Sequence, residues 1–207
     1  MTTKGEYKHT VMTRILHAIH MVSMVVLILS GFYIYAPLSF NIFPNMDIAR
    51  FLHFIFMYVV VATMIFKLYY SIAIGDLKNL WFNSQDLKDL PGVIRYYVFG
   101  IFKKKVRKKM GKYNAGQKLL YTLWPILLLF QVITGFAMYF EESFPGFIYF
   151  FGGLNHFKAW HAITAWIFTI TTVAHIYLGT TGHTIFDFYK QMITGYEKPL
   201  PLEGKAS

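Results

Sequence analysis

Hydrophobic positions gather in four long runs, and shorter polar segments separate these runs. The runs are Val11–Tyr35, Ile48–Ala73, Leu119–Phe140 and Phe157–Leu178. Each has about the 20 residues that a helix needs to cross the hydrocarbon core of a bilayer. The pattern therefore predicts an all-α integral membrane four-helix bundle, formed as a single domain over residues 1–207. Because the first run is longer than the apolar segment of a signal peptide, about 7–15 residues, we expect it to be retained.

The polar connection between the second and third runs, residues 76–118, has a pattern of its own. Its stretch "SQDLKDLPGVIRYYVFGIF" mixes Leu, Val, Tyr and Phe with charges, and Ser84 is a residue type that caps helices. This predicts an interfacial helix on the inner leaflet. The basic run "KKKVRKKMGK" follows, and we favour an anchor on anionic lipid over a specific docking site. The C-terminal segment from Tyr196 is expected to be disordered.

Charge then sets the expected topology. The chain has 20 Lys and Arg against 10 Asp and Glu, and charged residues are only 14% of the whole. More than half of the basic residues fall within residues 76–118, while the other two connections contain almost none. Because cytoplasmic loops carry the excess of Lys and Arg, both termini and this long loop are predicted to be cytoplasmic. The positive charge is thus a topology signal, and it does not indicate nucleic-acid binding.

The chain contains no cysteine. This excludes thiolate-bound iron–sulfur clusters, covalently attached c-type haem, disulfides and thiol catalysis within the chain. Any iron–sulfur chemistry must therefore belong to a partner.

Four histidines fall in the apolar runs at matching depths. His161 and His175 are 14 positions apart, which returns to nearly the same helix face about 21 Å further along the axis. Since the runs alternate in direction, His17 should lie near the cytoplasmic side and His53 near the outer side. The sequence therefore predicts an inner pair, His17 with His175, and an outer pair, His53 with His161.

Two facing imidazoles indicate a particular metal chemistry. Zinc needs three or four protein ligands at one point, and a proton relay needs acids between the two depths. Haem iron needs only axial ligands from the protein, because the porphyrin supplies four nitrogens. We therefore predict two b-type haems, although packed histidines are the plainer alternative for any one residue. His20 is the rival of His17 as the inner ligand. His156 is expected to face the outer interface, His9 and His183 lie in the flanks, and for His183 a surface position is favoured over a proton-shuttle role.

A cation stands three positions before three of these histidines. Arg14, Arg50 and Lys158 occupy these positions, where each could offset an anionic haem propionate. Anchors that extend to the membrane surface explain any single one equally well. Lys67, 14 positions after His53, is predicted to contact the inner haem propionate or a quinone.

The first and third runs share a short pattern. Ser30-Gly31 and Thr134-Gly135 each put a small hydroxyl residue before glycine. Such pairs allow a helix or a flat cofactor to approach the backbone closely. Ordinary helix packing accounts for the pattern equally well.

These features together resemble the γ (cytochrome b) subunit of respiratory membrane-bound formate dehydrogenase. The resemblance is carried by the four runs, the R-x-x-H motif "RILH", a histidine entering the second run, two in the fourth, and "KYNAGQK" from Lys112 to Lys118. Hydrogenase and thiosulfate-reductase cytochromes b share the histidine set more loosely.

The resemblance implies the assignment of the ligands and a second binding site. It assigns His17 and His175 to the inner haem iron, and His53 and His161 to the outer haem iron. It also implies a menaquinone site beside the inner haem, formed by Asn114, Gly116 and His175.

The resemblance further implies an electron-transfer role in the plasma membrane of a bacterium or archaeon. Electrons would come from an iron–sulfur subunit, supplied by a molybdenum or tungsten subunit that oxidises formate, and would pass through the outer and inner haems to menaquinone. The chain would be the quinone-reducing subunit, not the formate catalyst, and the complex could form a higher oligomer. Alternatives are a cytochrome b of a hydrogenase or another molybdoenzyme, or a non-redox membrane anchor or transporter.

Overall fold

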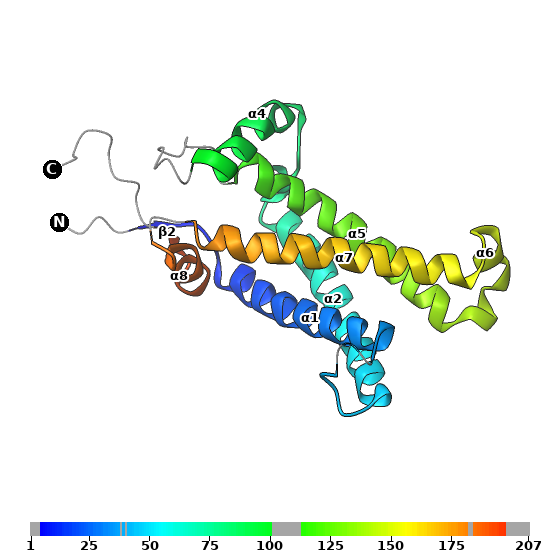
Figure 1. Cartoon of the computed structure of the whole chain (residues 1–207). Helices are drawn as coiled ribbons and strands as arrows, with labels where there is room; N and C mark the ends of the chain where they lie inside the picture. The colour runs from blue at the N-terminus through cyan, green and yellow to red at the C-terminus, as the bar shows by residue number, and fades with distance from the viewer. Residues whose placement is uncertain (1–4, 38, 40, 101–112, 182–183, 198–207) are drawn as a thin grey trace.

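Four long helices form the body of the molecule and lie alongside one another (Figure 1). The computed structural model describes residues 5–37, 39, 41–100, 113–181 and 184–197. The long helices are α1 (Val11–Tyr35), α2 (Met46–Ala73), α5 (Ala115–Tyr139) and α7 (Leu154–Gly179). Each is long and apolar enough to cross a membrane. The predicted all-α four-helix membrane fold is therefore confirmed.

Three of these helices, α2, α5 and α7, begin before the apolar runs that predicted them, and the first two have an asparagine cap. The Asn45 side chain accepts a hydrogen bond from the backbone N–H of Ile48 at 2.9 Å, at the start of α2. Asn114 does the same for Gln117 at the start of α5, also at 2.9 Å. A capped first turn is polar, so hydropathy alone places the helix start too late.

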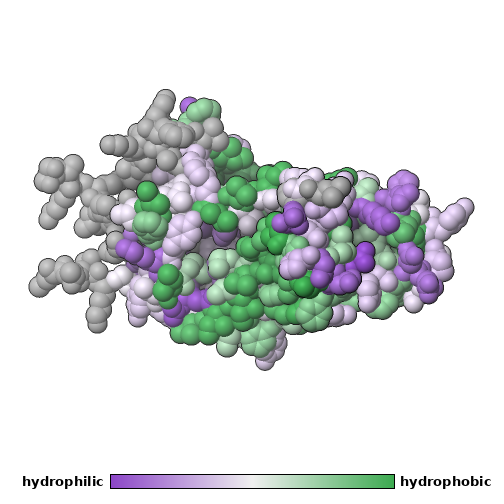
Figure 2. All heavy atoms as spheres, turned by 60° about the horizontal axis from the view of Figure 1, so that its bottom comes forward, coloured by the Kyte–Doolittle hydropathy of each residue, from purple (hydrophilic) through white to green (hydrophobic). Residues whose placement is uncertain are grey.

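The outer surface of the bundle is apolar. Ile65, Ile170 and Val173 are 60–65% exposed although they lie in the middle of long helices. On the face in Figure 2, hydrophobic residues cover the middle of the bundle and hydrophilic residues gather toward its ends. Such an extended apolar surface fits lipid rather than water.

The two ends of the chain meet at one end of the bundle, which we name the termini end. There β1 (Glu6–Tyr7) pairs antiparallel with β2 (Tyr196–Glu197), which follows α8 (Asp187–Thr194). Lys8 Nζ lies 2.8 Å from a carboxylate oxygen of Glu197. The expectation of disorder from Tyr196 onward was therefore wrong for Tyr196 and Glu197, and the rest of that segment lies outside the described residues.

The predicted interfacial helix is present at the same end, between α2 and α5. It comprises α4 (Ser84–Arg95), continued by a π-helical turn, η1 (Tyr96–Gly100), and preceded by the short α3 (Leu77–Leu80). The cap is Asn83 instead of the predicted Ser84. Asn83 accepts from the backbone N–H of Asp86 at 3.0 Å, and the Asp86 carboxylate accepts from the Asn83 N–H at 3.0 Å. The basic run that follows lies outside the described residues.

The opposite end of the bundle, which we name the α6 end, carries two short elements between α5 and α7. They are η2 (Glu141–Ser143) and α6 (Pro145–Phe150). The chain then turns into α7 through Gly152 and Gly153, which have φ angles of 90° and 95°. Only glycine adopts this conformation without strain, so the turn can be tight.

A cluster of buried hydrophobic residues, which we name the apolar layer, lies at mid-height of the bundle. It consists of Val60 from α2, Leu128 from α5 and Phe168 from α7. Met24, Met64 and Trp124 are among the partly buried residues that pack against it. The layer joins three long helices without a polar side chain among its three central residues.

Candidate functional site

Four imidazoles lie in two opposed pairs inside the bundle. The ring centroids of His53 and His161 are 6.4 Å apart, and those of His17 and His175 are 6.2 Å apart. The structure therefore brings together the same partners that helix direction and depth had matched. We call them the outer pair, nearer the α6 end, and the inner pair, nearer the termini end.

The spacing within each pair can be compared with that of two ligands on one metal ion. A metal–imidazole bond is about 2.0–2.1 Å long and a ring nitrogen lies about 1.1 Å from the ring centre, so rings on opposite sides of one ion have centroids about 6.3 Å apart. The observed 6.4 Å and 6.2 Å match this value. Each pair therefore has the ring spacing that two ligands on opposite sides of one iron would have.

The outer pair is held by hydroxyl groups on neighbouring helices. Ser30 Oγ on α1 lies 2.9 Å from Nδ1 of His53 on α2. Thr134 Oγ1 on α5 lies 2.9 Å from Nδ1 of His161 on α7. Both hydroxyl–glycine pairs are visible in the sequence, but the pattern alone did not assign them to histidines. The sequence could have suggested this role, because each Ser-Gly or Thr-Gly pair lies on the helix next to the one that carries its histidine.

The glycines beside these hydroxyls make room for the rings. A Cβ atom added at Gly31 would lie 3.3 Å from Cε1 of His53, and one at Gly135 would lie 3.3 Å from Cε1 of His161. These distances are shorter than ordinary van der Waals contact. Glycine thus lets each imidazole edge rest directly on the neighbouring helix.

The inner pair has different neighbours. Trp124 meets the His175 ring edge-on, with centroids 5.6 Å apart, and its indole N–H donates to Thr171 Oγ1 at 3.2 Å. His20 Nδ1 lies 3.5 Å from Thr63 Oγ1 on α2. The structure thus pairs His17 with His175 and directs His20 toward α2.

The apolar layer separates the two pairs. Phe168 is seven residues from both His161 and His175, and Val60 is seven residues after His53. Seven residues correspond to about 10 Å of helix, so the pairs are about 21 Å apart along α7. A close-packed apolar cluster of this kind leaves little room for water.

Lys67 lies on α2 toward the termini end. Its Nζ is 5.3 Å from the centroid of the Tyr121 ring on α5, within cation–π range. It is also close enough to interact electrostatically with His17 and His175. The structure thus places this cation beside the inner pair, and its contact with a propionate or quinone stays a prediction.

The three cations that precede histidines differ in their surroundings. Arg14 donates a guanidinium hydrogen bond to the Ile193 carbonyl of α8, and its Nε is buried with no hydrogen-bond partner among the described residues. Arg50 is exposed. Lys158 is exposed and lines a cavity of about 460 Å³ at the α6 end together with Glu141 and Glu142. An unsatisfied buried N–H at Arg14 fits an anionic group such as a carboxylate.

The described part of the motif "KYNAGQK" builds the start of α5. The Asn114 side chain accepts from the Gln117 N–H, and Gln117 Oε1 accepts from the Asn114 N–H at 3.0 Å. Asn114 is 4% exposed, and its Nδ2 lies 3.4 Å from the Tyr97 hydroxyl. A Cβ at Gly116 would lie 3.3 Å from the Asn114 side-chain oxygen and in ordinary contact with Val93 of α4, at 3.5 Å, so the tight approach at this glycine is to the cap.

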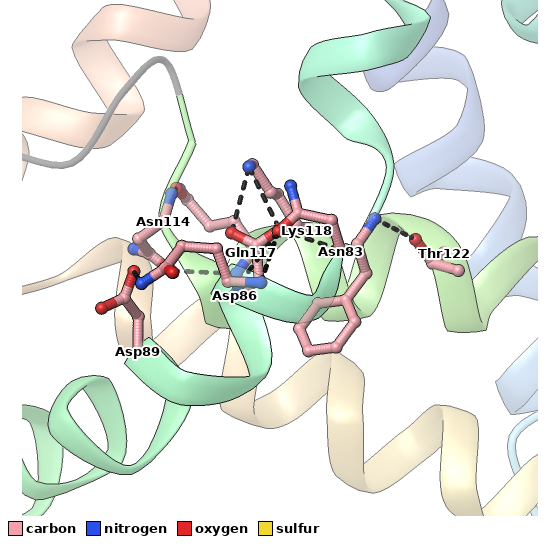
Figure 3. A network of polar contacts seen from close by, with 9 residues as sticks. Asn83, Asp86, Asp89, Asn114, Gln117, Lys118 and Thr122 are labelled. Carbon is pink, nitrogen blue, oxygen red and sulfur yellow. Dashed lines mark hydrogen bonds and ion pairs between the residues drawn. The ribbon is translucent and has the colours of Figure 1, made fainter.

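The same motif fastens α4 to α5 (Figure 3). Lys118 Nζ lies 3.0 Å and 3.2 Å from the two carboxylate oxygens of Asp86, and both side chains are largely buried. Thr122 Oγ1 accepts from the Phe82 N–H at 3.1 Å. The interfacial helix is therefore attached to the bundle by a buried ion pair and by hydrogen bonds.

A buried polar cluster lies at the termini end, near this junction. His9, which the sequence placed only in the flank before the first run, is 8% exposed, and its Nε2 lies 3.2 Å from Gln191 Nε2. Tyr113 is 6% exposed and faces both His9 and Tyr121, with ring centroids 6.3 Å and 4.9 Å away. Burial, followed by Tyr121 and Asp76, raises the pKa of Tyr113, so its phenol stays protonated. His156 is exposed as predicted, and His183 lies outside the described residues.

The alternative of a zinc site lacks the ligands it needs. Among the described residues, no three His, Cys, Asp or Glu side chains gather closely enough to hold a metal ion. Zinc sites in proteins use at least three such ligands. Each imidazole pair therefore suits a metal whose other ligands come from a macrocycle.

A bundle of four membrane helices with opposed histidine pairs defines the class of membrane b-type cytochromes. The chain belongs to the prokaryotic cytochrome b561 family, whose model matches residues 8–195. It is thus a membrane cytochrome of the kind that serves electron transfer, with haem of b type.

Curated relatives are similar along most of the chain. The "Probable Ni/Fe-hydrogenase B-type cytochrome subunit" of Azotobacter vinelandii is 25% identical over 196 residues, which cover 83% of this chain and 79% of the relative. A protein of the same name from Cupriavidus necator is 22% identical over 201 residues, which cover 84% and 78%. One from Rhizobium leguminosarum bv. viciae is 23% identical over 194 residues, covering 83% and 79%.

Proposed function

We propose that this chain carries electrons through the membrane by way of two b-type haems and delivers them to a quinone at the termini end. The observation that supports this most directly is the pair of opposed imidazole sets at 6.4 Å and 6.2 Å, about 21 Å apart along α7. His53 and His161 would hold the outer haem iron, and His17 and His175 the inner one.

Haem, when bound, supplies a centre that accepts and releases one electron. Two histidines holding one haem iron would leave it no open position for oxygen or substrate, which favours electron transfer over ligand chemistry. The apolar layer keeps water and ions from following the electron between the levels. Electrons would thereby pass between the two levels while protons would not.

The quinone would be reduced at the termini end, beside the inner pair. The proposed site, Asn114 and Gly116 with His175, is supported by the burial of Asn114 and by its Nδ2, whose contact among the described residues is a long one of 3.4 Å with the Tyr97 hydroxyl. The protonated Tyr113 phenol and the Lys67 ammonium provide nearby donors for the quinone oxygens. We propose menaquinone as the substrate, by resemblance to the formate dehydrogenase subunit.

The electron donor is proposed to be the iron–sulfur subunit of a hydrogenase, because the curated relatives carry that name. The motif "KYNAGQK" supports a second candidate, a formate dehydrogenase with a molybdenum or tungsten subunit. Native membranes distinguish the two. Hydrogen should reduce the b-type haem of this chain, and formate should not; the opposite result transfers the proposal to formate dehydrogenase.

The proposed orientation puts both termini and α4 in the cytoplasm. It is supported by the basic side chains around α4 and by their scarcity at the α6 end. Single cysteines introduced at Glu197 and Tyr149 of this cysteine-free chain test it. A membrane-impermeant thiol reagent added to intact cells should label the residue at position 149 only.

The haem content is the decisive experiment. The purified full-length chain should show b-type bands in a reduced-minus-oxidised spectrum and contain two haems per chain by the pyridine haemochrome method. A spectrum without such bands would overturn the proposal.

The Asn114→Asp variant tests the quinone site, because aspartate keeps the helix cap but removes the amide donor. Quinone reduction should fall while haem content stays unchanged.

A further inference from the structure

The hydroxyls of Ser30 and Thr134 each face two groups at once. Ser30 is fully buried, and its Oγ lies 2.6 Å from the Val26 carbonyl oxygen and 2.9 Å from Nδ1 of His53. Thr134 is 3% exposed, and its Oγ1 lies 2.9 Å from the Phe130 carbonyl oxygen. The same Oγ1 lies 2.9 Å from Nδ1 of its histidine. The two helices therefore repeat one arrangement.

The arrangement determines which ring nitrogen carries the proton. A hydroxyl has a single hydrogen, and a carbonyl oxygen can only accept. The hydroxyl hydrogen is therefore donated to the carbonyl of the preceding turn. Toward the ring, the hydroxyl oxygen is left as an acceptor, and the backbone of Leu27 and Gln131 offers His53 and His161 a further acceptor, so Nδ1 bears the hydrogen and donates it. The lone pair of each outer imidazole is then on Nε2, the nitrogen that must bind the metal.

The neighbouring glycines fix the plane of each ring as well. The Cε1 edge of His53 rests where a side chain of Gly31 would begin, and that of His161 rests where one of Gly135 would begin. Each ring is thus held by a hydrogen bond at one atom and by the helix backbone at the next. The rotation about the Cβ–Cγ bond is restricted from both sides.

On this basis we infer that Ser30 and Thr134 are positioning residues for the outer haem iron. They would set the tautomer, orientation and basicity of its two axial ligands without touching the iron. This inference rests on the proposed function, since it requires haem at the outer pair. Acceptors bonded to the second nitrogen of a ligand histidine raise its basicity, and their loss typically costs about 10–100-fold in metal affinity.

The experiment uses the purified full-length chain loaded with haem. Ser30→Ala and Thr134→Val remove one hydroxyl each, and valine keeps the volume of threonine. The outer haem should then show a higher midpoint potential, an altered low-spin EPR signal, and about 10-fold or more faster loss to apomyoglobin. The inner haem should be unchanged and serves as an internal reference. Thr134→Ser should behave like the wild type.

Two buried hydroxyl residues serve as matched controls, one on α1, which carries Ser30, and one on α7, which carries His161. Ser23 on α1 is fully buried and donates to the Ile19 carbonyl at 2.8 Å, and within the described part of the chain its hydroxyl makes no hydrogen bond to a histidine. Thr164 on α7 is 4% exposed and donates to the Trp160 carbonyl at 2.9 Å. Ser23→Ala and Thr164→Val should leave both haems as in the wild type.

Several results would overturn the inference. An unchanged outer haem in both Ser30→Ala and Thr134→Val contradicts it, and so does an equal shift in the controls. Loss of both haems in the two test variants, with both retained in the controls, assigns the hydroxyls to folding rather than to the outer site. A wild-type chain that binds no haem refutes the proposed function itself, which distinguishes the two failures.

Discussion

The outer and inner imidazole pairs occupy the same bundle, yet they are built differently. The outer rings are held by neutral hydroxyls and by glycine backbone, in an arrangement that α1 provides for α2 and that α5 repeats for α7. The inner rings lie near the start of α1, among Trp124 and the Lys67 cation. Close packing and neutral hydrogen bonds thus position the outer rings, whereas a nearby charge distinguishes the surroundings of the inner rings. A rigid, neutral site suits the entry of electrons, and a charged environment suits coupling to protons and a quinone.

The largest effect is expected from removing the ligands themselves. His161→Ala and His53→Ala should each lose the same haem, and His175→Ala should lose the other, so that haem per chain falls to about half because one axial ligand alone holds haem poorly. Redox titration of the remaining haem identifies which one is left. Loss of different haems in His53→Ala and His161→Ala would contradict the pairing.

A smaller effect is expected from filling the space beside the outer rings. Gly31→Ala and Gly135→Ala should displace the rings, since the new Cβ would lie 3.3 Å from Cε1, and should destabilise the outer site by about 1–3 kcal/mol. Thermal release of haem, followed by absorbance, measures this. Gly146→Ala is the control, because a Cβ there meets no atom within 4 Å. A selective loss of the inner haem would overturn the prediction.

Removing the Lys118–Asp86 ion pair, which fastens α4 to α5, tests whether this helix supports the proposed quinone site. Lys118→Met leaves the Asp86 carboxylate buried without its partner, which should cost about 1–3 kcal/mol. Faster hydrogen exchange in α4 and weaker quinone reduction are expected, with the outer haem unchanged. Lys190→Met, at an exposed position of α8, should change neither quantity. Unaltered exchange in α4 would show that the ion pair does not hold the helix.

The smallest effect is expected from Lys67→Met, which removes one cation beside the inner pair. A nearby positive charge favours the reduced haem, so the inner midpoint potential should fall by tens of millivolts, and quinone reduction should slow. Spectroelectrochemistry of the purified chain measures the potential. If haem content, potential and quinone reduction are all unchanged, Lys67 has no role at this site.

Hydropathy and helix periodicity were enough to predict the four long helices and to match the histidines by depth. They could not distinguish His17 from His20, because both lie on the same part of α1 and only packing directs His20 to Thr63. The hydroxyl–glycine pairs were visible, but their role depends on which helices are neighbours. The strand pairing and burial of His9 were missed because they join the two ends of the chain, and a local pattern does not report such contacts.

The apolar layer of Val60, Leu128 and Phe168 has a consequence for energy conversion. An electron that passes this layer alone moves charge through a medium of low permittivity, and the full membrane voltage costs about 2.3 kcal/mol per charge for each 100 mV. Transfer between the two levels would therefore slow as the cell becomes energised. The membrane voltage would act across this layer and would thereby control the rate of electron transfer between the two levels.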